Sequence, residues 1–169
     1  MLGPDLEKRA GEIVRLYSER GLKIVTAESC TGGLVAGCLT AIAGSSAVVE
    51  RGFVTYSNEA KIELLSVSAE LIASVGAVSA ETAAAMAHGA LSHSRADIAV
   101  SVTGIAGPSG GSVEKPVGLV HFACAARNER PTLVEMRFGD IGRTLVRQKS
   151  VEVALDLLTE AALSAPGRP

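Results

Sequence analysis

The sequence contains no tryptophan, and aromatic residues make up only 3% of the chain. Hydrophobic residues still account for 47% of its 169 residues and charged residues for 20%, a composition typical of a soluble α/β protein whose interior is filled by Ala, Val, Leu and Ile. This length is sufficient for a substantial core but short of the length at which a second core is expected. We therefore expect residues 1–169 to form a single domain.

Clusters of basic residues are also absent. Lys and Arg are scattered along the chain and the net charge is -2, whereas nucleic-acid surfaces gather basic residues to neutralise phosphates. No apolar run reaches the length of a membrane span, and residues 1–14 lack the apolar centre of a signal peptide. We expect a cytoplasmic protein with no nucleic-acid partner and no membrane partner.

Closely spaced cysteine pairs are missing as well. Cys30, Cys38 and Cys124 are odd in number and include no closely spaced metal-type pair, which indicates reduced thiols. The histidines at 88, 93 and 121 show no metal-ligand spacing, and we interpret His88 and His121 as structural. We therefore expect no metal.

Helical and strand patterns alternate along the chain. Strands are expected at residues 22–28, 48–56, 96–104, 117–127 and 132–138. Helices are expected at residues 5–20, 34–44, from Ser57, at one further segment, at 79–94 capped by Ser79, and from a cap at Asp140 through Leu163. The order predicts an α/β fold in which a mixed sheet lies between two layers of helices. Residues 164–169 are expected to be a frayed tail.

Three of the strands end in polar or glycine-rich sequence: "AESCTGG", "TYSNEAK" and "SVTGIAGPSGG". Ligands in open α/β sheets bind beyond the carboxyl ends of the strands, where loops lead into helices. If these three strand ends are neighbours, they form one cleft.

The first strand end, "AESCTGG", contains the possible nucleophiles Ser29, Cys30 and Thr31. Gly32 and Gly33 would let a ligand approach the backbone closely, and the N–H groups at a helix start would stabilise an oxyanion or hold a phosphate. The alternative is that a Ser or Thr before Gly-Gly simply caps the helix. The segment is neither a Walker loop nor a Gly-x-Ser-x-Gly nucleophile elbow.

The second strand end places Lys61 in or just after the first turn of the helix capped by Ser57. Desolvation and the positive helix end both favour the neutral amine, which can take a proton from a serine hydroxyl. Tyr56 could relay or donate a proton. The alternative is a solvated Lys61 that extends to the surface.

Arg143 and Arg147 lie one turn apart near the start of the last helix. Together they could clamp a phosphate or carboxylate. Alternatively, they pair with surface carboxylates such as Asp140.

Five strings resemble the CinA C-terminal domain family, whose enzymes are nicotinamide mononucleotide deamidases: "TAESCTGGLVA", "AIAGSSAVVERGFVTYSNEAK", "GAVSAETA", "SVTGIAGPSGGSVEKPVGLV" and "FGDIGR". The resemblance runs from about Thr26 to Arg147. Larger family members carry a further N-terminal domain, so this chain resembles the stand-alone form. The resemblance implies hydrolysis of the substrate carboxamide to nicotinate mononucleotide and ammonia, with a small-molecule nucleotide as substrate, no cofactor and a homo-oligomeric assembly.

The resemblance also assigns roles to residues. It implies Ser29 as nucleophile, Lys61 and Tyr56 as proton-transfer partners, and Arg143 near the substrate, although the short match around Arg143 can be shifted onto Arg147. Residues implied to line the same pocket are Ser46, Thr103 and Gly104. Backbone N–H groups of Thr31, Gly32 and Gly33 would bind the oxyanion, while the phosphate would lie against the loop 107–111 or the arginines.

Three rival interpretations remain at this point. One is a cysteine amidase that uses Glu28, Cys30 and Lys61. Another is a non-catalytic partner associated with competence or DNA damage, which the slightly acidic composition does not favour as a DNA binder. The third is a nucleotide-binding module without catalysis.

Overall fold

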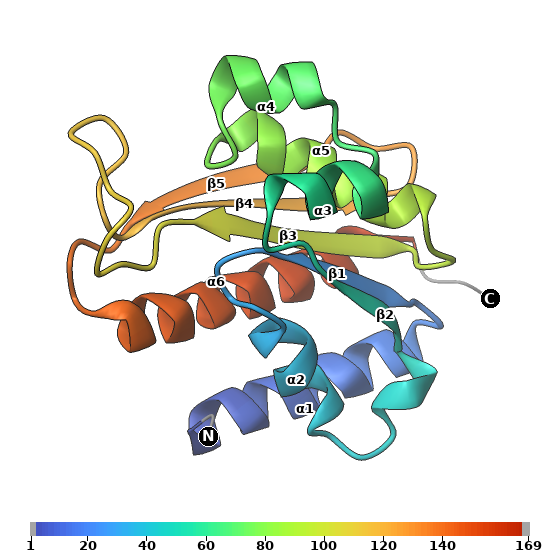
Figure 1. Cartoon of the computed structure of the whole chain (residues 1–169). Coiled ribbons are helices and arrows are strands. Elements are labelled where there is room, and N and C mark those ends of the chain that lie inside the picture. Colours follow the sequence, from blue (N-terminus) through green and yellow to red (C-terminus); the bar gives the residue numbers. More distant parts are fainter. Residues whose placement is uncertain (1–2, 167–169) are drawn as a thin grey trace.

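The computed structural model describes residues 3–166 and consists of a five-stranded sheet between two layers of helices (Figure 1). The strands are β1 (Ile24–Glu28), β2 (Val49–Val54), β3 (Ile98–Gly104), β4 (Leu119–Ala126) and β5 (Thr132–Arg137). The helices are α1 (Pro4–Glu19), α2 (Leu34–Thr40), α3 (Asn58–Leu65), α4 (Ala69–Val75), α5 (Ala80–Ser92) and α6 (Arg143–Ser164), with the 3-10 helix η1 (Ser45–Ala47) before β2. None of the described helices combines the length and hydropathy needed to cross a membrane.

The strand order is β2-β1-β3-β4-β5, and the sheet is mixed as predicted. β1 pairs in parallel with both β2 and β3, whereas β3, β4 and β5 pair antiparallel. Glu28, the last residue of β1, lies opposite Val54 of β2 and Val102 of β3. The carboxyl ends of the three parallel strands therefore meet at one edge of the sheet.

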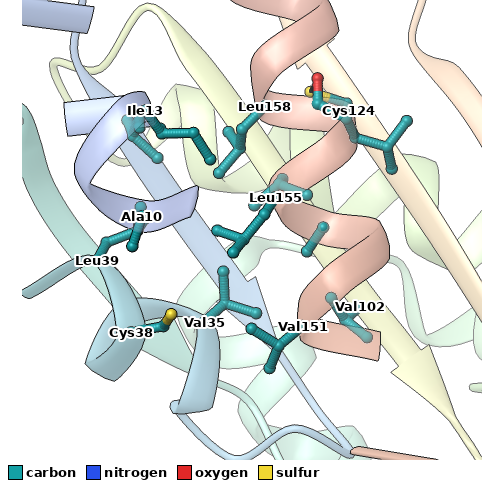
Figure 2. Close-up of a cluster of buried hydrophobic side chains, with 14 of the residues drawn as sticks. Ala10, Ile13, Val35, Cys38, Leu39, Val102, Cys124, Val151, Leu155 and Leu158 are labelled. Carbon is teal, nitrogen blue, oxygen red and sulfur yellow. Dashed lines mark hydrogen bonds between the residues drawn. The ribbon is translucent and has the colours of Figure 1, made fainter. Parts of the chain in front are cut away.

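The two faces of the sheet are covered by different helices (Figure 1). α1, α2 and α6 cover one face around a large apolar cluster, in which Leu155 and Leu158 of α6 lie beside side chains from α1, α2 and β3 (Figure 2). α3, α4 and α5 cover the other face, where alanines of α5 pack on small residues of the sheet. The predicted three-layer α/β/α architecture is confirmed.

Helix boundaries follow the predicted caps in some places and depart from them in others. Ser57 and Ser79 cap α3 and α5 through their hydroxyls, as predicted. The prediction that Asp140 caps the last helix is wrong, because the N-cap of α6 is Gly142 and no side chain caps it. α2 ends at Thr40, short of the predicted Gly44, whose φ of 87° is incompatible with a continuing helix. Of the predicted tail, residues 167–169 lie outside the described part of the chain.

Candidate active site

A cavity of about 300 Å³ lies where the carboxyl ends of the parallel strands meet. Its walls come from the three segments that follow β1, β2 and β3, together with the α4–α5 connection and the start of α6. The lining residues are Ser29, Cys30, Tyr56, Asn58, Lys61, Ala77, Val78, Thr103, Gly104, Ile105, Ala106, Gly107, Ser109, Gly110 and Arg143. The three polar strand ends thus form one cleft, as expected from the sequence.

Ser29 and Lys61 meet in the wall of this cavity. Ser29 directly follows β1, and Lys61 lies on α3, whose start is fixed by the Ser57 hydroxyl. Lys61 Nζ lies 3.1 Å from Ser29 Oγ and donates to the carbonyl oxygens of Thr55 at 2.8 Å and Ser57 at 3.4 Å. The alternative of a solvated lysine is wrong, because Lys61 is only 1% exposed.

The surroundings of Lys61 favour its neutral form. Burial lowers the pKa of the Lys61 amine, and the weaker influence of the nearby Cys30 thiol acts in the opposite direction. No carboxylate within residues 3–166 forms an ion pair with Lys61. A neutral amine can donate its two N–H bonds to the two carbonyls and direct its lone pair at the Ser29 hydroxyl. This is the arrangement that a general base for a serine nucleophile requires.

Tyr56 and Arg143 form a second polar group in the cavity wall. Arg143 Nη2 donates to the Tyr56 hydroxyl at 2.9 Å, and Nη1 donates to the carbonyl oxygen of Gly107 at 3.1 Å. The guanidinium therefore joins the start of α6 to both the β2–α3 segment and the loop after β3. Tyr56 is 59% exposed and makes no hydrogen bond to Ser29 or Lys61. Any proton transfer through Tyr56 has to involve a bound substrate or water.

Glu28 occupies the N-terminus of α2. Its carboxylate accepts from the N–H groups of Gly33 at 3.1 Å, Val35 at 3.0 Å and Ala36 at 2.9 Å. The expectation that Gly33 offers its N–H to an oxyanion is therefore wrong. Sequence reasoning missed this cap because Glu28 lies five positions before Gly33, outside the usual capping positions.

Gly32 and Thr31 do not face the cavity either. The Gly32 N–H donates to the carbonyl oxygen of Ser29 at 3.0 Å. Thr31 is fully buried, and its hydroxyl has no partner among the described residues, so it neither caps α2 nor lines the cavity. The N–H groups of Cys30 and Thr31 donate to no other group within residues 3–166. Of these two residues, Cys30 lines the cavity.

The two arginines of α6 have separate positions. Arg143 lines the cavity, whereas Arg147 Nε donates to the carbonyl oxygen of Cys30 at 3.1 Å and Nη2 to that of Thr31 at 2.9 Å. The prediction that they clamp one anion together is wrong, because Arg147 is bound to backbone carbonyls. The alternative of pairing with Asp140 is wrong too, since neither arginine forms an ion pair in the described chain.

Thr103 and Gly104 lie in the cavity wall, as the resemblance implied. Thr103 Oγ1 donates to the carbonyl oxygen of Ala77 at 2.8 Å, which fixes the α4–α5 connection beside the site. Ser46 lies in η1, just before the first residues of β2, which pair with the start of β1 at the opposite edge of the sheet. The expectation that Ser46 lines the same pocket is therefore wrong within one copy of the chain.

Several lining residues were not foreseen from the sequence. Asn58 is the first residue of α3, next to the Ser57 cap, so its side chain could have been considered together with Lys61. Ala77 and Val78 belong to the α4–α5 connection and offer no chemical signal in the sequence. Gly107, Ser109 and Gly110, by contrast, belong to the loop 107–111, which the sequence already offers as a phosphate site.

Cys30 has the properties of a buried structural thiol. It is 5% exposed, and burial, with a smaller contribution from Glu28, raises the pKa of the Cys30 thiol to about 12. Both carboxylate oxygens of Glu28 accept from backbone N–H groups. The cysteine amidase interpretation therefore lacks both its thiolate and its free carboxylate. Within residues 3–166 there is also no group of three His, Cys, Asp or Glu that could hold a metal ion.

Comparisons with known proteins connect this geometry to one family. The sequence model of the CinA C-terminal domain family matches residues 6–162 of this chain. The nicotinamide-nucleotide amidohydrolase PncC of Escherichia coli (strain K12) is 50% identical over 164 residues, which cover 96% of this chain and 98% of that protein. A putative competence-damage inducible protein of Symbiobacterium thermophilum is 55% identical over 130 residues, 77% of this chain but 30% of that protein. Among solved structures, the competence/damage inducible protein CihA from Agrobacterium tumefaciens superposes with a TM-score of 0.94 at 57% identity, covering 97% of this chain and 99% of that one.

Proposed function

Because the chain belongs to the CinA C-terminal domain family, we propose that it is an amidohydrolase that converts nicotinamide mononucleotide to nicotinate mononucleotide and ammonia. The match to the family model confirms the prediction, made from the sequence motifs, that the chain belongs to this family. The substrate is supported by the relative named nicotinamide-nucleotide amidohydrolase, which this chain matches over almost its whole length. The key structural support is the 3.1 Å separation of Lys61 Nζ and Ser29 Oγ in the wall of an open cavity.

The proposed reaction begins with the Ser29 hydroxyl. Its oxygen attacks the carboxamide carbon while its proton passes to the neutral Lys61 amine. The tetrahedral intermediate then collapses, the C–N bond breaks, and Lys61 gives the proton to the departing nitrogen, directly or through Tyr56. A water molecule releases the acyl group from Ser29 as the carboxylate, with Lys61 acting again as base.

The oxyanion of the tetrahedral intermediate needs donors close to Ser29. The backbone N–H of Cys30 is the best candidate, because Cys30 lines the cavity and its N–H donates to no other residue in the described part of the chain. The Asn58 side-chain amide is a second candidate, since Asn58 lines the same wall as Lys61. These donors replace Gly32 and Gly33, whose N–H groups are already bound.

The remaining cavity would hold the rest of the nucleotide. Arg143 supplies a permanent positive charge near the glycine-rich loop 105–118, and this combination suits a phosphate. Its hydrogen bonds to Tyr56 and Gly107 leave the guanidinium at the cavity surface. We assign Arg143, rather than Arg147, to substrate binding.

Ammonia release from nicotinamide mononucleotide tests the proposal, with free nicotinamide as the control substrate. We expect repeated turnover by the wild-type chain and none by Ser29→Ala. A folded wild-type protein that binds the nucleotide but releases no ammonia would show instead a non-catalytic binding module. Binding of DNA at physiological salt, with no ammonia release, would favour a role like that suggested by the names of the competence-associated relatives.

A further inference from the structure

The segment that carries Ser29 is held in place by two oppositely charged side chains. We call residues 29–33 the Ser29 turn. Its glycines have left-handed backbone angles, with φ of 59° at Gly32 and 94° at Gly33, so the turn departs sharply from both β1 and α2. Such a turn keeps one conformation only if its surroundings fix it.

Glu28 fixes the end of the turn that leads into α2. Its carboxylate is 1% exposed and binds three N–H groups, those of Gly33, Val35 and Ala36, at 2.9 to 3.1 Å. The chain therefore leaves β1 at Glu28, passes through the turn and returns to the side chain of the same residue. A charged acceptor for three N–H groups is stronger than a hydroxyl cap.

Arg147 fixes the middle of the turn from the opposite side. Its half-buried guanidinium donates to the carbonyl oxygens of Cys30 and Thr31 at 3.1 and 2.9 Å. Its Nη2 also lies close to Gly32, since a Cβ there would be 3.5 Å away. The negative Glu28 carboxylate accepts from backbone N–H groups, and the positive Arg147 guanidinium donates to backbone carbonyl oxygens. Each charge therefore faces the end of the backbone dipole that has the opposite sign.

We propose that Glu28 and Arg147 are positioning residues that keep Ser29 Oγ within reach of Lys61 and the Cys30 N–H aimed at the substrate. Neither residue lines the cavity, so both act through the Ser29 turn. This inference rests on the proposed serine mechanism. Misplacement of reacting groups by about 1 Å costs roughly 100-fold in rate, so loss of either side chain lowers kcat while substrate binding persists.

The first test is Arg147→Met, matched by Arg127→Met. Arg127 also donates to backbone carbonyls, those of Leu91, Ser94 and Ala96, but it lies away from the cavity. We expect Arg147→Met to lower kcat by about 10- to 100-fold with KM unchanged. Arg127→Met loses a comparable set of hydrogen bonds and keeps its kcat, and Arg147→Lys, which retains one donor group, falls between Arg147→Met and the wild type.

The second test is Glu28→Gln, matched by Ser68→Ala. Ser68 caps α4, a helix of seven residues like α2, and α4 contributes no residue to the cavity. We expect Glu28→Gln to lower kcat and Ser68→Ala to leave it unchanged. In both tests the fraction of folded protein is measured by circular dichroism, and activity is normalised to it.

Chemical labelling of Ser29 tests this inference independently of which substrate the protein hydrolyses. A fluorophosphonate that labels activated serines is added, and its rate of reaction at Ser29 is followed by intact mass. Slower labelling of Arg147→Met and Glu28→Gln than of their controls supports positioning, even if nicotinamide mononucleotide is not hydrolysed. Equal labelling or an unchanged kcat in these variants overturns it, and a wild-type Ser29 that resists the label overturns both the mechanism and this inference.

Discussion

At the residue scale, Ser29 and Lys61 form one chemical unit, so their substitutions should not be additive. We expect Ser29→Ala and Lys61→Met each to lower kcat by roughly 10³-fold or more, and the double variant to be scarcely worse than either single variant. Steady-state ammonia release from purified, folded proteins measures this. A double variant whose loss equals the product of the two single losses would show that the two groups act in separate steps.

Cys30 provides the control for that experiment at the neighbouring position. Its thiol is buried, and its pKa is raised to about 12, so it is not a nucleophile at neutral pH. Cys30→Ala should retain most of its kcat and lose about 1 kcal/mol of stability. A dead Cys30→Ala variant beside an active Ser29→Ala variant contradicts the serine mechanism.

The protonation of Lys61 predicts the pH dependence of catalysis. A base works only when neutral, and burial lowers the pKa of this amine below the usual 10.5. The kcat/KM of the wild type should therefore rise with pH, with the midpoint of the rise below pH 10.5. A kcat/KM that is flat from weakly acidic to strongly alkaline pH, or one that rises only around the pKa of a free lysine, argues against Lys61 as the base.

At the element scale, the position of Lys61 depends on how closely α3 approaches α5. Gly89 of α5 faces the last turn of α3, where an added Cβ would lie 2.0 Å from the carbonyl oxygen of Leu65. Gly89→Ala must therefore separate the two helices, and we expect it to lower the free energy of unfolding by about 1–3 kcal/mol and to reduce kcat. Denaturant titration and ammonia release measure the two effects.

Gly11→Ala is the matched control for Gly89→Ala. Gly11 is also a helical glycine, in α1, but an added Cβ there meets nothing within 4 Å. Alanine is favoured over glycine in a helix by roughly 0.5–1 kcal/mol, so this variant should be slightly more stable and fully active. If both variants are equally stable, the close approach of α3 and α5 has no energetic weight.

Some features of the site at this scale could be predicted from the sequence, and others could not. The strand ends and the Ser57 cap were predictable, because both depend on neighbouring residues in the chain. The role of Glu28 was not, since its carboxylate reaches α2 across a turn with two left-handed glycines. Arg143 and Arg147 share one helical face, and only the path of the Ser29 turn past Arg147 separates their contacts.

At the scale of the whole molecule, the buried Lys61 amine makes stability depend on pH. Its pKa is depressed in the folded state, so between that pKa and 10.5 the unfolded chain holds a proton that the folded chain does not. Stability should therefore rise with pH through this window, because the cost of burying a charge disappears. The cost is fully present below the folded pKa.

Lys61→Met isolates this contribution. The buried Tyr17, Cys30 and Cys124, whose pKa values are raised, weaken stability at high pH, but all three are present in both proteins. Urea titrations at several pH values should show the wild type gaining free energy of unfolding relative to Lys61→Met as the pH rises from 7 towards 10. A difference that is constant with pH means that Lys61 keeps its proton in the folded state.

Substrate choice also belongs to the whole molecule, because the cavity is assembled from segments that lie far apart in the chain, between Ser29 and Arg143. If the ring amide lies at Ser29 and the phosphate lies near Arg143, binding energy from the phosphate helps to orient the amide. We expect nicotinamide mononucleotide to have a much higher kcat/KM than nicotinamide riboside or free nicotinamide. Arg143→Met should reduce this preference, and similar kcat/KM values for all three compounds in the wild type would remove the phosphate site.

The change from parallel to antiparallel pairing at β3 separates the site into two structurally distinct parts. Ser29 and Lys61 follow parallel strands, whereas the loop 105–118 joins β3 to its antiparallel neighbour β4. That loop is closed at its base by hydrogen bonds of Ile105 to Leu119 and of Gly118 to Ile105. Because an antiparallel connection needs no crossover helix, another loop of different length could be grafted between Ile105 and Gly118 without disturbing the sheet. The reaction centre would then stay constant while the neighbouring loop, which would set the selectivity for the substrate, is exchanged. The fold is therefore a starting point for amidases directed at other carboxamides.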